Sequence, residues 1–123
     1  MYNLSMLITQ TNLQKLAEKL WAEYAETFPR LVKFDCPKII INNRFTSTGG
    51  VNDSYENRVE LAGKFFANNK KNMLEVILPH ELAHQIDYNI NGWFERRKHH
   101  NSKWCEIMVL IGQIPDPYHR MVL

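Results

Sequence analysis

The chain has 123 residues, of which 45% are apolar and 23% charged, and its formal net charge is +2. These values exclude a disordered chain, a second catalytic domain and a strongly basic nucleic-acid binder, so we expect one folded domain over residues 1–123. No run of about 18 apolar residues and no secretory leader is present, which predicts no membrane contact and a cytoplasmic location. Two distant cysteines, Cys36 and Cys105, form no C-x-x-C pair, and we expect both to be reduced.

The first predicted element is an amphipathic helix over residues 11–28. Thr11 and Gln14 match a capping box at its start, and Pro29 marks its end. Its aromatic residues fall at helical spacing, which is typical of a core-facing side rather than of a binding stripe.

Residues 37–62 favour β structure, because short runs of β-branched residues alternate with turn residues such as Gly49 and Gly50. We expect three short antiparallel strands here. A strand edge close to a metal site could hold an extended substrate as an added strand, whereas the alternative is an ordinary half-buried sheet. The sequence does not separate these two interpretations.

A second helix is predicted from about Met73, with Asn72 as its N-cap, after a connection anchored by two phenylalanines. Pro79 inside it should cause a kink. The helix is apolar on most sides, which indicates a buried helix. The residues of its apolar stripe are Leu74, Leu78, Leu82 and Ile86.

This helix carries the motif H-E-x-x-H at residues 80–84. His80 and His84 lie on one helical face, where both imidazoles can bind one small cation, while Glu81 lies at the flank of that face. A zinc hydrolase needs this division between ligands and a general base. The alternative is an amphipathic helix with histidines at a polar rim, but burying these groups without a partner costs several kcal/mol.

A last helix is expected over residues 101–112, after a helix stop at residues 89–92 and a basic run. The position of this helix limits which residue can be the third zinc ligand. A metzincin would place that histidine where Ile90 stands, and Glu106 faces away from the predicted core. His99 and His100 remain, and inward packing of Trp104 brings His100 toward the metal helix.

The run Glu75-Val76-Ile77-Leu78-Pro79-His80-Glu81-Leu82-Ala83-His84, followed by His100-x-x-x-Trp104-x-x-x-Met108, resembles the SprT family of zinc metallopeptidases, which includes the Spartan proteases. The bacterial branch is the most similar. Weaker agreement covers residues 46–50 and 115–119. The resemblance implies a minimal zincin-like α+β domain, one Zn²⁺ per chain held by His80, His84 and His100, and Glu81 as general base.

Two departures from the family pattern stand out. The glycine that usually follows the third histidine is Asn101, which tolerates left-handed backbone angles. The sequence also stops before the cysteine-rich zinc ribbon that many relatives carry and that is associated with DNA contact.

We therefore expect a metallopeptidase that cleaves a protein or peptide substrate, with DNA-associated proteins as one candidate group. Tyr88 is the first candidate for stabilising the oxyanion, ahead of His99 and His119, although a packing role is the alternative. Asp87 is expected either to orient a ligand imidazole or to be a solvated residue at the helix end.

The competing hypothesis is a catalytically silent zinc-containing module that binds nucleic acid or protein. Its candidate phosphate contacts are Arg96, Arg97, Lys98, Lys70 and Lys71. A structural zinc site needs a fourth ligand and no base, so the intact Glu81 favours the enzyme. The sequence does not indicate an oligomeric state.

Overall fold

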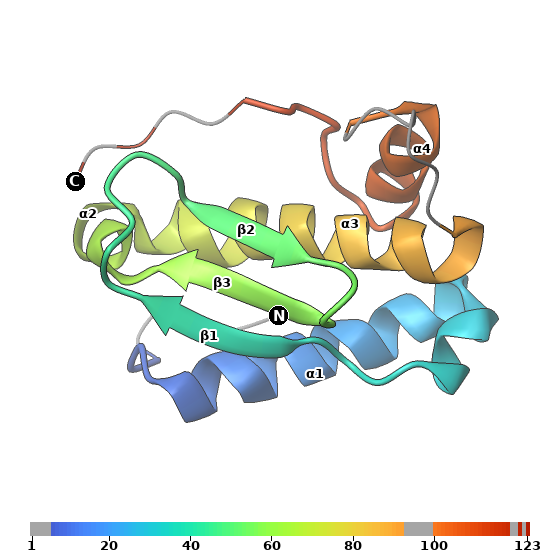
Figure 1. Ribbon diagram of the computed structural model, residues 1–123, viewed down its shortest axis with the longest axis horizontal. Helices are drawn as coiled ribbons and strands as arrows, with labels where there is room; N and C mark the ends of the chain where they lie inside the picture. The colour runs from blue at the N-terminus through green and yellow to red at the C-terminus, as the bar shows by residue number, and fades with distance from the viewer. Residues whose placement is uncertain (1–5, 93–99, 119–120, 122) are drawn as a thin grey trace.

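The computed structural model describes residues 6–92, 100–118, 121 and 123, and it shows a three-stranded sheet with helices packed on one face (Figure 1). The fold is α+β, as predicted. The helices are α1 (Gln10–Thr27), α2 (Phe66–Asn72), α3 (Leu78–Asn91) and α4 (Ser102–Leu110), and the strands are β1 (Lys38–Asn42), β2 (Gly50–Asp53) and β3 (Arg58–Ala62). Short 3-10 helices span Pro29–Lys33 and Gly63–Phe65.

The start of α1 differs from the predicted capping box. Thr9 is the N-cap, and its hydroxyl accepts the backbone N–H of Asn12 at 3.1 Å. Gln14 instead serves the sheet: its amide nitrogen donates to the carbonyl of Pro37 at 3.0 Å and its oxygen accepts the N–H of Ile39 at 2.8 Å. In a capping box the side chain at the fourth position bonds back to the backbone N–H of the cap residue. The side-chain amide of Gln14 instead bonds to the backbone of β1 and the residue before it.

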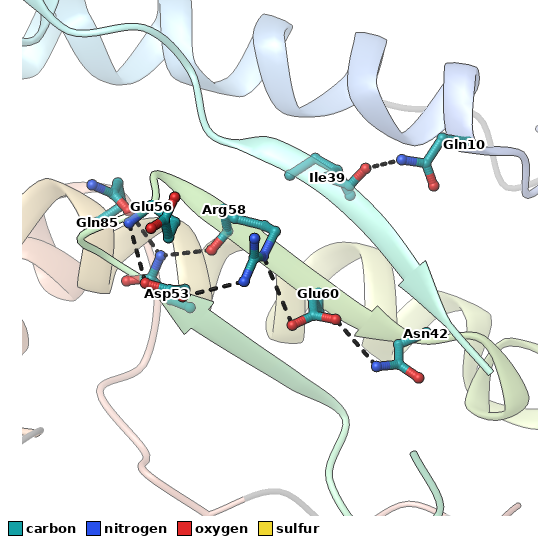
Figure 2. A network of polar contacts seen from close by, with 9 residues as sticks. Gln10, Ile39, Asn42, Asp53, Glu56, Arg58, Glu60 and Gln85 are labelled. Atoms are coloured by element: carbon teal, nitrogen blue, oxygen red, sulfur yellow. Dashed lines mark hydrogen bonds and ion pairs between the residues drawn. The ribbon is translucent and has the colours of Figure 1, made fainter. Parts of the chain in front are cut away.

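Gln10 repeats this role one helical turn earlier. Its side-chain nitrogen donates to the carbonyl of Ile39 (Figure 2), and its oxygen accepts the N–H of Ile41 at 3.1 Å. The two glutamines together satisfy backbone groups along the outer edge of β1. An edge covered in this way is not open to pairing with another strand.

The sheet has the order β1-β3-β2. β2 and β3 pair antiparallel as expected, but β1 and β3 pair in parallel, so the prediction of an all-antiparallel sheet is wrong. Asn42 pairs with Ala62 and Gly50 with Leu61, so the loop of residues 43–49 passes the end of β3 to reach its other side. Apolar alternation reports which face of a strand is buried, and it carries no information on the order or direction of its neighbours.

The two faces of the sheet differ in chemistry. The inner face carries Ile39, Val59 and Leu61, which are fully buried against the helices. On the outer face Arg58 pairs with Asp53 at 3.2 Å, in a polar network that continues through Glu60 to β1 (Figure 2). The sheet is therefore packed on one side only, with α1 behind β1 and α3 behind β2.

The helical run that contains the motif begins earlier than predicted. Asn72 has helical backbone angles and makes no cap, because α2 continues through a π-helical turn, Met73–Ile77, into α3. In this wide turn the N–H of Leu78 donates to the carbonyl of Met73. Pro79 has no N–H to continue the regular ladder, so the expected interruption takes the form of a π turn immediately before the first histidine.

The end of α3 and the last helix agree with the sequence in outline. Gly92 has a positive φ of 75° and donates its N–H to the carbonyl of Tyr88, which confirms the predicted helix stop. α4 packs on α3 through buried Trp104 and Met108. Asn101 caps α4 by accepting the N–H groups of residues 103 and 104, and its φ of −78° shows that the left-handed conformation is not used.

Replacing Gln14 with methionine should lower the free energy of unfolding by about 1–2 kcal/mol, because the carbonyl of Pro37 and the N–H of Ile39 lose their partner at similar side-chain volume. Urea denaturation measures the change. Lys15→Met on the exposed face of the same helix should change stability by less than about 0.5 kcal/mol. Equal stability of the two variants would contradict the capping role.

Candidate metal centre

Three histidine side chains converge between α3 and the start of α4. The Nε2 atoms of His80 and His84 are 3.3 Å apart, as expected for residues one turn apart on a helix. His100, immediately before the cap of α4, brings its Nε2 to 3.1 Å from that of His80. The candidate ligand atoms of all three lie within 4.8 Å of one another.

The spacing of these nitrogens fits a small cation. A zinc ion bound at about 2.0–2.1 Å by tetrahedrally placed nitrogens holds them about 3.3–3.4 Å apart. The separations of His80 from His100 and from His84, 3.1 and 3.3 Å, lie close to this value, and the ligand atoms of His84 and His100 lie within 4.8 Å of one another. Neutral imidazoles whose lone pairs point at a common centre repel one another unless a proton or a cation lies between them. The three residues therefore fit a divalent metal as one shared set of ligands.

Trp104 holds the rings in place. It is fully buried, it stacks on His84 at 5.2 Å between ring centroids with an interplanar angle of 16°, and it meets His80 and His100 edge-on at 4.8 and 4.6 Å. Its indole N–H also points to the carbonyl of His80 at 3.5 Å. One apolar side chain from α4 thus contacts all three imidazoles.

Glu81 lies beside this set without belonging to it. Its side chain is buried, and Oε2 is 3.8 Å from Nε2 of His80. Burial raises the pKa of Glu81 to about 8, and a hydrogen bond from the backbone N–H of Asn52 works in the opposite direction. A carboxyl group with a pKa close to neutrality can both accept and release a proton at physiological pH.

His80, His100 and Glu81 open onto a cleft of about 660 Å³. His80, Glu81 and His100 form one side, and Gly49 to Asn52 of the β2 edge form the next. Pro117, Tyr118 and Met121 from the C-terminal segment also line it. The edge of β2 therefore lies beside the histidines. A sheet that holds an extended substrate at its edge needs this position.

Asp87 is not a solvated residue at the helix end. It is buried, and its carboxylate accepts hydrogen bonds from the side-chain amides of Asn91 at 2.9 Å and Asn101 at 3.5 Å. Because Asn101 follows His100, Asp87 connects the metal helix to the segment that carries the third histidine. The contact with Asn101 therefore connects Asp87 to the residue next to the third histidine.

The other candidates have different positions. Tyr88 is half-buried and is not among the described residues that line the cleft, whereas Tyr118 is. Glu106 is exposed on α4, in agreement with its exclusion as a ligand. Lys70 donates to the carbonyl of Met6, and Lys71 pairs with Glu75 at 4.0 Å. The remaining candidates lie outside the described residues: Arg96, Arg97, Lys98, His99 and His119.

A polar contact between α3 and β2 was not predicted from the sequence. Gln85 is buried at 1% exposure and accepts a hydrogen bond from the side chain of Asn52 at 2.9 Å. The available signal was a glutamine one turn after Glu81, within a helix that is otherwise apolar on that side. Its partner could not be read from the sequence, because it lies 33 residues earlier.

A single helix that supplies two histidines and a buried glutamate, together with a third histidine from the turn before α4, forms a cluster that could hold a metal ion. The model of the SprT-like family matches residues 13–121, which is most of the chain. The chain belongs to the SprT-like family. No solved structure matches it. Among the described residues, no helix is long and apolar enough to cross a membrane.

In metal-free protein, Glu81→Gln should increase stability relative to the parent, and the increase should grow between about pH 5 and pH 8 and level off above pH 8. A folded-state pKa of about 8 lies above the unfolded value of about 4, so the stabilisation by the neutral carboxyl is complete below the unfolded pKa and is lost progressively as the pH rises from there to 8. We expect a difference of about 2–4 kcal/mol by pH 9 from urea denaturation in EDTA. The exposed Glu26→Gln should show no such trend, and a pH-independent difference for Glu81→Gln would contradict the buried-carboxyl assignment.

Proposed function

We propose that this protein is a zinc metallopeptidase. The observation that supports it most directly is the convergence of three imidazole nitrogens, at 3.1 and 3.3 Å, beside a buried glutamate on the wall of an open cleft. Metallopeptidases need three protein ligands, an accessible position for water and a carboxylate that is not a ligand. His80, His84 and His100 are the proposed ligands and Glu81 the proposed base.

Zinc held by these histidines supplies Lewis-acid polarisation of the scissile carbonyl and lowers the pKa of water toward neutrality. Glu81 takes a proton from the attacking water on one carboxylate oxygen and delivers it to the nitrogen of the leaving amine. The N–H of Asn52 orients this carboxylate. Trp104 excludes water from the inner side of the histidines, which keeps the reacting side at the cleft.

The edge of β2 provides the proposed substrate site. The carbonyl of Gly49 accepts the N–H of Ala62 on β3. Because successive residues of a strand point their backbone groups to alternate sides, the N–H and carbonyl groups of Gly50 and Asn52 point away from β3. An extended peptide can pair with this edge as an added strand and cross the metal centre. Tyr118 lines the same cleft and replaces Tyr88 as the candidate that stabilises the oxyanion.

The binding-module alternative requires a closed zinc site with a fourth ligand. Among the described residues the candidate ligands at this site number three, and Glu81 is not one of them. A site with three ligands that faces a cleft is open, which supports catalysis over a structural role. Protein or peptide is the proposed substrate class, and adding single-stranded DNA to the assay tests for stimulation by DNA.

Purified protein should contain about one zinc per chain, and His100→Ala should lose it because two histidines from one helix leave the coordination incomplete. His99→Ala is the matched control and should retain the metal. Elemental analysis after dialysis measures both. Loss of zinc from the His99 variant alone would reassign the third ligand.

Glu81→Gln should retain zinc but lose peptidase activity by about 10²–10⁴-fold, because the amide cannot accept the proton of the attacking water. Cleavage of casein, an unfolded protein that can enter the cleft as an extended chain, measures the activity. Cleavage by the variant at the rate of the parent, or no cleavage by the zinc-loaded parent on any protein substrate tested, would defeat the proposal.

A further inference from the structure

We propose that Gln85 and Asn52 are positioning residues, whose side-chain contact holds the edge strand β2 against α3 at the place where the backbone of Gly50 lies against the side chain of Glu81. This inference deepens the proposed function, since it assigns two further residues to the geometry of the general base. It also makes a claim about the structure that can be tested without measuring activity.

Gln85 has every feature of a residue that connects two elements. It lies one helical turn beyond Glu81 on α3 and is almost completely buried, with 1% exposure. Its side-chain oxygen accepts the amide of Asn52 at 2.9 Å, and its nitrogen donates to the carbonyl of Ser54 at 3.1 Å and to Asn89 at 3.0 Å. A buried amide with partners for both oxygen and nitrogen is strongly fixed in orientation.

Asn52 extends the connection across the sheet. Its side-chain nitrogen also donates to the carbonyl of Arg58 at 3.1 Å, and its oxygen accepts the hydroxyl of Ser54 at 2.5 Å. One side chain therefore ties α3, the start of β3 and the turn after β2 together. Figure 2 shows Gln85 of α3 beside Asp53 and Arg58 at this end of the two strands.

Gly50 makes the second contact between the same elements. A Cβ at this position would lie 3.2 Å from Cγ of Glu81 and 3.1 Å from Cγ2 of Ile77, so the backbone of β2 approaches α3 closely here. Four residues of α-helix advance about 6.0 Å, and two residues of a strand advance about 6.7 Å. Gly50 can therefore face Glu81 while Asn52 faces Gln85, with both pairs in register.

The alignment of β2 with α3 determines where the backbone N–H of Asn52 points. The backbone of Asn52 faces away from β3, where the N–H of an edge strand would ordinarily meet solvent or a paired substrate. Here it lies near enough to Glu81 to lower the pKa of that carboxyl against the larger effect of burial. Gly50 is left as the residue of β2 that can exchange hydrogen bonds with a substrate strand.

The strand would not keep this position unaided. β2 has four residues and pairs with a single neighbouring strand. Short edge strands fray easily because few contacts oppose their opening. The contact between Gln85 and Asn52 supplies the missing constraint, so its loss should release the N–H of Asn52 from Glu81 while the histidines stay in place.

Amide hydrogen exchange, followed by NMR on the zinc-loaded protein, tests the geometry directly. In the parent, the amide of Asn52 should exchange at least about tenfold more slowly than that of Gly50, although both face the open edge. Gln85→Met should abolish this difference, and Gln14→Met, which removes a glutamine from the opposite edge of the sheet, should preserve it. Unchanged protection of the Asn52 amide in Gln85→Met would overturn the inference.

Asn52→Asp provides a second variant in case Gln85→Met does not fold. It keeps the side-chain shape and the acceptor for Ser54 but places an oxygen against the oxygen of Gln85. The same loss of amide protection is expected in this variant. Retention of the parent pattern would count against the proposed connection.

Kinetics test the consequence for the base. Gln85→Met should lower kcat about tenfold with KM and zinc content unchanged, and should have no further effect in a Glu81→Gln background, because coupled residues are not additive. Gln14→Met should retain kcat. Equal kcat losses in the two methionine variants would indicate a general effect of stability and overturn the inference. If the parent itself cleaves no protein, the proposed function fails and the exchange experiment alone decides this inference.

Discussion

The contact of Trp104 with three imidazole rings is the interaction on which the candidate site depends. The spacing of α3 brings His80 and His84 together without help from the rest of the fold, but His100 follows 16 residues after His84. Its position is determined by the packing of α4 on α3, with Trp104 fully buried at the contact and Asn101 linking the cap of α4 to Asp87. The candidate metal ligands and the core packing therefore share one interface, and a change in one should affect the other.

The sheet contributes an asymmetry between its two edges. Gln10 and Gln14 satisfy the outer edge of β1, whereas the outer edge of β2 lines the cleft with the histidines. Under the proposed function, an extended substrate would therefore pair on the side of the sheet where the three histidines lie. The strand order makes this possible, because β3 lies between β1 and β2 and leaves β2 at the edge next to α3.

Local pattern was sufficient for α1, α3 and α4 and for the convergence of the three histidines, but not for α2. The spacing of H-E-x-x-H sets two histidines on one face, and the inward period of Trp104 and Met108 indicates where His100 should lie. The parallel direction of β1 relative to β3 and the π-helical turn before Pro79 could not be derived from the sequence. Both depend on how alternative backbone arrangements pack in the folded protein. Gln14 shows the same limit at a single residue: its spacing from Thr11 suits a cap, but a strand more than 20 residues away offers two hydrogen bonds and is preferred.

The burial of Glu81 connects the energetics of the fold with its proposed chemistry. A carboxyl group in this environment destabilises the fold when it is charged, and the raised pKa expresses that cost. The same environment gives a base that can exchange protons near neutral pH, which an exposed carboxylate cannot do. The N–H of Asn52 favours the charged form, and a cation at the neighbouring histidines would favour it further. Burial of the carboxyl is thus opposed by a backbone dipole, which the close approach of β2 to α3 at Gly50 brings near Glu81.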